Sequence, residues 1–353
     1  MNLLAFRLAE ISRGQVRAHM LVRIAKLSLI SLALCTAVFV LIFFLYPSPP
    51  PQPTTFGVTF SRVQAEGFGL DWKKTYIDIL DDLGVKHMRL SAYWNDIEPE
   101  KGEYNFEILD WQIEEAKKRD AKILLAIGRK LPRWPECHTP KWASGLSQSE
   151  QNAAVLRMLE TVVARYKNES AVWAWQVENE PLFKFGICPP RDREFFEEEV
   201  LFVRSLDASR SIVTTDSGEM SFWVMSGSQG DIFGTTMYKV VHGRGIGFFS
   251  YDFLPAVFYR KKAAILKKLL PNVKDVIVVE LQAEPWTAGI PVNTDTINRQ
   301  FRRFSFKRFQ NHIRYARDVG YSETYLWGVE WWAWLKTEAG HPEFWEEARG
   351  LFK

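Results

Sequence analysis

Short apolar runs rich in β-branched residues alternate with stretches of helical period along most of this chain. The runs lie near residues 56–60, 86–91, 122–127, 172–178, 211–215, 231–237, 275–280 and 323–329. Runs of this length and composition are typical of buried strands. Apolar residues recur at helical spacing between most of them, at 71–83, 107–119, 149–167, 191–206, 255–270 and 297–319. The connection from Glu219 to Met225 has room only for a small helix.

Eight alternations of strand and helix predict an α/β fold, the (β/α)8 TIM barrel, over residues 55–353. A doubly wound open sheet is the alternative. That fold would place a glycine-rich phosphate-binding turn after the first strand, and the residues found there, 61–64, read SRVQ. We therefore favour the barrel.

The first part of the chain has a different pattern. No charged residue occurs from Leu27 to Tyr46, a length that spans a bilayer as a helix. The preceding residues 1–26 contain one acidic residue, Glu10, and several basic ones: Arg7, Arg13, Arg17, Arg23 and Lys26. This bias predicts a single-pass protein of the cell membrane, with 1–26 as a cytoplasmic leader and the barrel extracytoplasmic. The proline-rich residues 47–54 would form an extended linker.

A cleaved signal peptide is the alternative for this N-terminal segment. We disfavour it because the charged leader is long and the apolar run exceeds an ordinary signal-peptide core. No cleavage site with small residues follows the run.

Composition narrows the classes of function. The net charge is only +3, which gives no indication of a nucleic-acid partner. Fourteen Trp, 25 Phe and 11 Tyr supply flat apolar faces that suit sugar rings, although such residues also fill cores. The three cysteines lack a repeated metal-binding spacing, and we expect neither a metal nor an organic cofactor.

Two carboxylates follow predicted strands at comparable positions. Glu180 comes just after the run 172–177, and Glu280 directly follows the run 276–279. The carboxyl ends of barrel strands meet at one rim, where active sites of this fold lie. Two carboxylates that face each other across a cleft are the minimal machinery for hydrolysing a glycosidic bond.

The surrounding motifs resemble those of the clan A glycoside hydrolases, which include the family 5 cellulases and mannanases and the family 42 β-galactosidases. Residues 175–181 read WQVENEP, like the fourth-strand motif of that clan, and Arg89 matches its second-strand arginine. Residues 99–106, PEKGEYNF, resemble the run that follows strand two. The similarity extends over about 55–350, but no single family's motif set matches throughout, so the resemblance does not identify the substrate.

The resemblance implies a role for each matched residue. Glu180 would be the general acid/base and Glu280 the nucleophile. Arg89 and Tyr238 would hold the nucleophile, and Asn179 would bond the 2-hydroxyl of the sugar. The division is physically reasonable, since an acid needs a raised pKa and a nucleophile needs hydrogen-bond donors nearby.

Other glutamates compete with Glu280 for the role of nucleophile. Glu284 lies four residues further on, in the loop, Glu178 precedes Asn179, and Glu330 follows the last strand. We prefer Glu280 because a rigid strand end holds a nucleophile better than a loop does. We expect Glu284 to line the cleft and Glu178 to cap a backbone end or pair internally.

Further side chains complete the predicted substrate-binding set. The last strand ends in an aromatic cluster where clan members place a tryptophan beneath the cleaved sugar, and Trp327 and Trp331 share one strand parity. Core packing is the alternative for at least half of that cluster. The full set is Arg89, Trp94, His138, Asn179, Tyr238, Gln282, Glu284, Trp327 and Trp331.

Two cysteines are predicted to pair. Cys137 follows the third strand and Cys188 the fourth, so their loops should be neighbours at the active-site rim. Outside the cytoplasm two such thiols would oxidise to a disulfide.

These observations predict a glycosidase that hydrolyses O-glycosyl bonds, specifically a retaining β-glycoside hydrolase with an extracytoplasmic poly- or oligosaccharide substrate. One alternative is a glycan-binding barrel without activity. Another is a transglycosylase that remodels surface polysaccharide with the same two glutamates.

Overall fold

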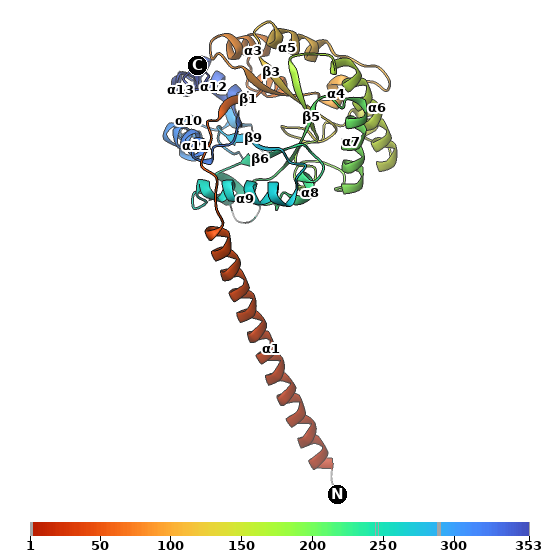
Figure 1. The fold of residues 1–353 in the computed structure, drawn as a ribbon, viewed down its shortest axis with the longest axis vertical. Coiled ribbons are helices and arrows are strands. Elements are labelled where there is room, and N and C mark those ends of the chain that lie inside the picture. Colours follow the sequence, from red (N-terminus) through yellow and green to blue (C-terminus); the bar gives the residue numbers. More distant parts are fainter. Residues whose placement is uncertain (1–2, 244, 246, 288–290, 353) are drawn as a thin grey trace. The chain divides into compact units, whose positions relative to one another are not determined.

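Eight parallel strands close into a barrel in the computed structural model, which describes residues 3–243, 245, 247–287 and 291–352. Neighbouring strands are hydrogen-bonded in the order β1-β10-β9-β6-β5-β4-β3-β2. These strands are β1 (Thr55–Thr59), β2 (His87–Ser91), β3 (Lys122–Ile127), β4 (Val172–Val177), β5 (Ser211–Asp216), β6 (Ile232–Met237), β9 (Asp275–Gln282) and β10 (Glu323–Trp327). The predicted TIM barrel is confirmed, and each predicted strand is present (Figure 1).

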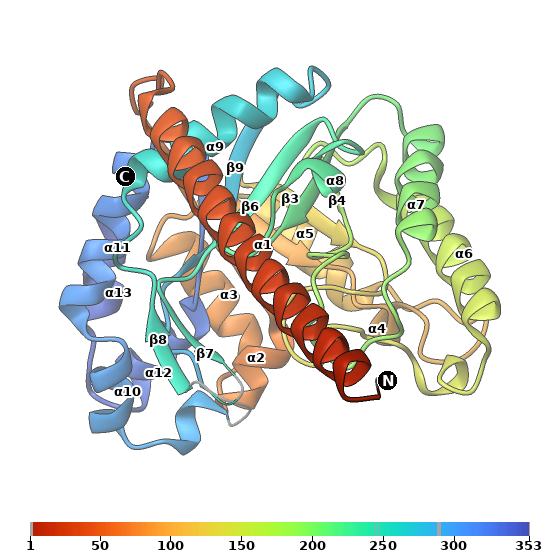
Figure 2. The ribbon, with the colours of Figure 1, turned by 90° about the horizontal axis from the view of Figure 1, so that it is seen from below.

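Helices cover the outside of the barrel, as Figure 2 shows for α6, α7 and α11. The longer ones are α3 (Trp72–Asp81), α5 (Glu107–Lys117), α6 (Gln148–Tyr166), α7 (Arg193–Leu206), α9 (Ala256–Leu269), α10 (Ile297–Arg303), α11 (Phe306–Val319), α12 (Val329–Thr337) and α13 (Glu343–Arg349). Shorter helical pieces are α2 (Arg62–Gly67), α4 (Trp94–Ile97), η1 (Lys141–Ala143), α8 (Val224–Gly227) and η2 (Val292–Thr294). As expected, only the small helix α8 occupies the fifth connection.

Two local features differ from the predicted pattern. The stretch 297–319 breaks at Phe304, whose side chain is fully buried, and Ser305 then caps the new helix α11 by accepting from the Arg308 amide. After β6 the chain forms an antiparallel hairpin of β7 (Val240–Gly243) and β8 (Gly247–Ser250), which the alternation of strand and helix did not predict (Figure 2).

The chain divides into two units, Met1–Pro49 and Pro50–Lys353. The first unit contains one continuous helix, α1 (Leu3–Leu45), so the predicted border between leader and membrane span falls inside a helix. Within it Met20–Leu45, 26 residues, is long and apolar enough to cross a membrane.

The barrel core has an inner and an outer layer. The inner layer fills the barrel with Leu124, Ala174, Val213, Ile277, Val279 and Tyr325. The outer layer lies between strands and helices, and alternate strand residues such as Ile123 and Leu125 belong to it. Because the interior is packed, chemistry is confined to the rim at the carboxyl ends of the strands.

Candidate active site

A β-bulge turns Glu280 toward the inside of the barrel. Ile277 and Val279 face the interior, so strict alternation would point Glu280 outward. The register of β9 against β6 shifts between Thr235, opposite Val278, and Thr236, opposite Glu280. One extra residue in a strand re-aims the following side chain, and Glu280 is accordingly buried among interior polar groups.

Glu280 receives hydrogen bonds on both carboxylate oxygens. Arg89 Nη1 donates to Oε1 at 2.9 Å, and the Tyr238 hydroxyl donates to Oε2 at 2.9 Å. The two hydrogen bonds hold the carboxylate in one orientation. Burial and the Glu280 charge together raise the pKa of Tyr238, which keeps its hydroxyl a donor.

Arg89 organises this side of the site from a fully buried position on β2. Besides Glu280 it binds Gln176 Oε1 through Nε at 2.8 Å and Asn179 Oδ1 through Nη2 at 2.8 Å. One guanidinium therefore orients both the predicted nucleophile and the amide predicted to meet the sugar.

Glu180 lies in a turn that the chain makes after β4. Its φ is 46°, in the left-handed region that residues other than glycine rarely adopt. Thr215 Oγ1 accepts from the Glu180 amide at 2.8 Å, and Lys130 Nζ donates to the carbonyls of Asn179 and Glu180 at 2.9 and 3.1 Å. These contacts hold a strained backbone in place, as is common at functional sites.

The Glu180 carboxyl has an environment opposite to that of Glu280. Thr236 Oγ1 donates to its Oε1 at 3.1 Å, and Thr236 is the strand partner of Glu280, so the two glutamates are neighbours. Burial, reinforced by the Glu280 charge, raises the pKa of Glu180 to about 8. A carboxyl with this pKa remains a proton donor at neutral pH.

Glu178 connects the end of β4 to the loop after β3. Its two oxygens accept from the backbone amides of Arg129 and Lys130 at 2.7 and 2.6 Å, which matches the expected internal role. Gly128 is required beside it, because a Cβ on Gly128 would lie 2.6 Å from Glu178 Oε1.

Trp327 does not present a bare ring to a sugar. The Arg133 guanidinium lies 3.9 Å from the centre of its ring. Arg133 also donates to Glu284 at 2.5 Å and to Glu330 at 2.8 Å. Glu284 thus lies at the rim, as expected, within a buried ionic cluster that covers the tryptophan.

The predictions for Trp331 and Trp94 are wrong. Strand β10 ends at Trp327, so Trp331 lies in α12, where strand parity has no meaning. Both indoles are fully buried, with Trp331 Nε1 bonded to Gln300 and Trp94 Nε1 to Glu98. They pack the core and cannot contact a substrate.

Gln282 and His138, two further residues of the predicted substrate-binding set, make structural contacts. The Gln282 side chain accepts from the Lys239 and Val240 amides and so anchors the hairpin after β6. His138 stacks on Tyr93 with ring centres 4.1 Å apart, and burial lowers its pKa. It stabilises the loop after β3 as a neutral ring.

Several residues of the site were not predicted, chiefly Lys130, Arg133, Glu136 and Thr236. Glu136 is buried, and burial raises its pKa to about 7. Only their position in the sequence could have indicated them, since Lys130, Arg133 and Glu136 lie between the end of β3 and His138.

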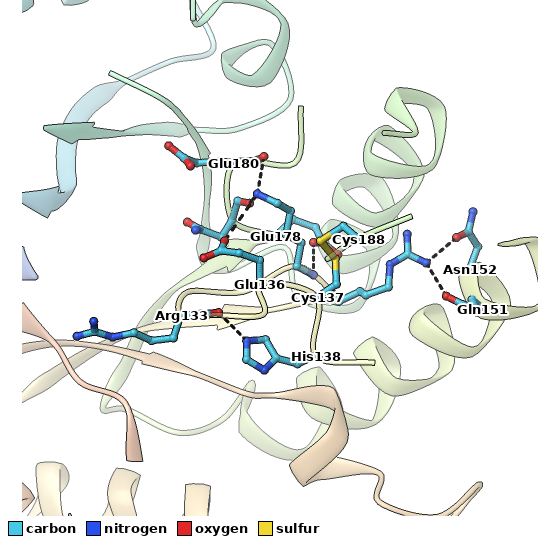
Figure 3. The surroundings of a disulfide bond; sticks show 12 residues. Arg133, Glu136, Cys137, His138, Gln151, Asn152, Glu178, Glu180 and Cys188 are labelled. Carbon is cyan, nitrogen blue, oxygen red and sulfur yellow. Dashed lines mark hydrogen bonds and ion pairs between the residues drawn. A yellow bond between two sulfur atoms is a disulfide. The ribbon is translucent and has the colours of Figure 1, made fainter. Parts of the chain in front are cut away.

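Cys137 and Cys188 form the predicted disulfide, with Cα atoms 5.2 Å apart (Figure 3). It joins the loop after β3 to the loop after β4.

Replacing Cys188 by alanine in the full chain should lower the free energy of unfolding by about 2–4 kcal/mol, measured by urea denaturation. The matched control, Cys35→Ala, removes an exposed free thiol and should change little. Two reactive thiols in the folded, unreduced wild-type barrel would contradict the bridge.

Residues 70–147 match the family model described as β-galactosidase. The chain is 28% identical over 129 residues to β-galactosidase BgaA of Clostridium cellulovorans, covering 31% of this chain and 19% of that protein. It is 39% identical over 64 residues to the probable mannan endo-1,4-β-mannosidase A of Aspergillus niger, covering 17% and 15%. The chain thus spans less than a fifth of these relatives, and the family match includes Arg89 but neither glutamate.

Solved structures share the fold. GH5_18 of Bifidobacterium longum subsp. longum superposes with a TM-score of 0.54 at 13% identity, covering 78% of this chain and 69% of that one. Endo-glycoceramidase II from Rhodococcus sp. gives a TM-score of 0.53 at 14% identity, covering 79% and 75%. The family match covers less than half of this chain, and the likeness to the solved structures at 13–14% identity shows a shared barrel fold.

Proposed function

We propose that this chain is a retaining β-glycoside hydrolase that uses Glu180 as general acid/base and Glu280 as nucleophile. The observation that carries the proposal is the contrast between two neighbouring carboxyls. Glu280 is bonded by Arg89 and Tyr238, whereas Glu180 is buried with a raised pKa. Two paired carboxyls that lie in different environments take different roles in catalysis.

Each step follows from these contacts. Glu180 protonates the glycosidic oxygen while ionised Glu280 attacks the anomeric carbon, which gives a glycosyl-enzyme ester and releases the leaving group. Glu180, now ionised, removes a proton from water, and the resulting hydroxide displaces Glu280 from the sugar. In this proposal the Asn179 amide, whose oxygen accepts a hydrogen bond from Arg89, binds the 2-hydroxyl of the sugar.

The stereochemistry of the product tests the mechanism. The full chain in detergent is screened against aryl β-glycosides and β-linked polysaccharides, and the first sugar released is followed by proton NMR. The proposal expects the β-anomer before mutarotation. An α-anomer would mean inversion, transfer to a second sugar would mean a transglycosylase, and binding without turnover would mean a glycan-binding barrel.

The pH dependence tests the acid. Since Glu180 must be protonated to act and burial raises its pKa to about 8, kcat/KM should stay high to near pH 8 and fall above it. The Glu180→Ala variant, assayed on a substrate with a good leaving group, should lack this alkaline limb. A wild-type limb near 4.5, the ordinary value for Glu180, would contradict the assignment.

We further propose that Met20–Leu45 anchors the enzyme in a membrane, with the barrel outside the cytoplasm and an extracytoplasmic saccharide as substrate. The charge bias of the leader and the disulfide both support this orientation. Protease added to intact expressing cells should remove the barrel. Protection of the barrel would place it in the cytoplasm, and its recovery as a soluble protein would indicate a cleaved signal.

A further inference from the structure

Glu136 is a buried carboxyl beside the pair that the proposed mechanism does not use. Only 6% of its surface is exposed, and its Oε2 has no hydrogen-bond partner among the described residues. The nearby cation Lys130 is 3.8 Å from that oxygen, beyond hydrogen-bond length, and is itself bonded to backbone carbonyls. A buried acceptor in this state is costly unless something else satisfies it.

The surrounding loop forces Glu136 into this position. Its φ is 74°, and short backbone bonds tie it to Leu131 and Arg133 at 2.8 Å each. The next residue, Cys137, is joined to Cys188. Gly186 presses from the other side, since a Cβ there would lie 2.5 Å from the Glu136 Cβ. A strained residue that is held by this many constraints, and whose carboxyl oxygen lacks a hydrogen-bond partner among the described residues, indicates a functional role for that oxygen.

The carboxyl faces the reacting centre. Lys130 Nζ, 3.8 Å from Glu136 Oε2, also donates to the carbonyls of Asn179 and Glu180, which places the three residues around one ammonium group. Burial first, and then the Glu280 charge, raise the pKa of Glu136. Figure 3 shows the side chains of Glu136 and Glu180 extending to the same side of the site, away from the disulfide. The Glu136 carboxyl therefore lies close to the Asn179 side chain, to which the proposed mechanism assigns the 2-hydroxyl of the sugar.

We propose that Glu136 determines specificity by accepting a hydrogen bond from the 3-hydroxyl of the sugar whose bond is cleaved. This inference rests on the proposed function. Above its pKa of about 7 the Glu136 carboxyl is ionised and accepts but does not donate, so its partner there must be a donor on the substrate. The ring position next to the 2-hydroxyl, on the side away from the anomeric carbon, is the 3-hydroxyl.

The site also restricts the class of sugar. The carboxyls of Glu136 and Glu280 interact electrostatically, so the carboxylate of a uronic acid in this subsite would add a further negative charge beside them. The structure assigns to the subsite a sugar with a free 3-hydroxyl and no carboxylate.

Deoxygenated substrates test the contact. An aryl β-glycoside that the full-chain wild type hydrolyses is compared with its 2-deoxy, 3-deoxy and 4-deoxy analogues. In wild type the 3-deoxy analogue should lose about 10- to 100-fold in kcat/KM, the size of a charge-assisted hydrogen bond. For the parent substrate, Glu136→Met should have a kcat/KM lower than that of wild type by a similar factor. Within this variant, removing the 3-hydroxyl should cost little more, because the contact is already lost. The losses in kcat/KM caused by removing the 2-hydroxyl or the 4-hydroxyl should be the same as in wild type.

Two further variants exclude a purely structural effect. Glu136→Gln keeps an oxygen acceptor without the charge and should retain an intermediate 3-deoxy penalty, and Glu107→Gln, exposed on α5, should behave as wild type. If the Glu136 variants lose the same factor on all four substrates, or lose selectivity at another position, the inference is wrong. If wild type hydrolyses no glycoside, the proposed function itself has failed.

Discussion

Replacing Glu280 by glycine is expected to abolish hydrolysis of every β-glycoside that the wild type cleaves. No glycosyl-enzyme can form without this carboxylate, so the double displacement stops at its first step. Arg89 and Tyr238, which bind Glu280 at 2.9 Å each, then line a vacated space with two donors. That space suits a small anion.

Azide should therefore restore turnover in the glycine variant, but with inverted stereochemistry. The anion enters where the carboxylate was and attacks the anomeric carbon from the same face, which gives an α-glycosyl azide in one step. Product analysis by NMR, with an activated aryl glycoside as substrate, shows the outcome directly.

Glu180→Ala should behave in the opposite way. An aryl glycoside with a good leaving group needs little acid assistance, so its glycosyl-enzyme still forms, whereas substrates with poor leaving groups should slow by about 10²- to 10⁴-fold. Azide, which needs no general base, should then attack the glycosyl-enzyme and give a β-glycosyl azide of retained configuration.

Glu284→Ala is the matched control for this pair. Glu284 is a buried rim glutamate on the same connection, but its carboxylate is bonded to Arg133. It should keep wild-type stereochemistry and show no azide-dependent inversion. If Glu284→Ala instead gave the α-glycosyl azide while Glu280→Ala stayed active, the nucleophile would be Glu284.

The alternation of apolar runs and stretches of helical period was sufficient to predict the barrel. Each repeat must bury an apolar strand beneath an amphipathic helix, and both patterns can be recognised in the sequence. The candidate glutamates followed from the same logic, since the strand ends meet at one rim. Cys137 and Cys188 were predicted to pair because consecutive barrel strands place their loops side by side.

What the sequence could not show lies in the local backbone geometry. Alternation along β9 would have pointed Glu280 outward, and only the bulge at Val279 brings it in. The last strand ends at Trp327, before the end of the aromatic run. Trp331 therefore lies in helix α12, with its side chain in the core. Arg133 over Trp327 could not be foreseen, because a loop with φ of 79° at Arg133 determines where that guanidinium points.

The second large effect concerns Arg89, the fully buried guanidinium that connects the site. Arg89→Met should lower the free energy of unfolding by about 3–5 kcal/mol, the usual result of removing one partner of a buried ion pair. The methionine has a similar reach but no charge, so Glu280 stays buried without its cation. Urea denaturation of the full chain in detergent measures the loss.

A second substitution separates the charge from the packing. Arg89→Met combined with Glu280→Gln removes both charges, so the double variant should be more stable than Arg89→Met alone. Recovery should be partial, because Gln176 and Asn179 also lose the bonds that Arg89 donates to them. The control Arg193→Met breaks a surface pair with Glu197, in which the arginine side chain is 55% exposed, and should cost less than about 1 kcal/mol.

The catalytic consequence follows from the same contacts. Without Arg89 the Glu280 carboxylate loses its charged hydrogen-bond donor, and the acidic limb of the kcat/KM profile should move to higher pH. The alkaline limb set by Glu180 should move less, since Arg89 does not bond that carboxyl. If Arg89→Met matched wild type in both stability and pH profile, Arg89 would neither compensate the Glu280 charge nor hold the nucleophile ionised.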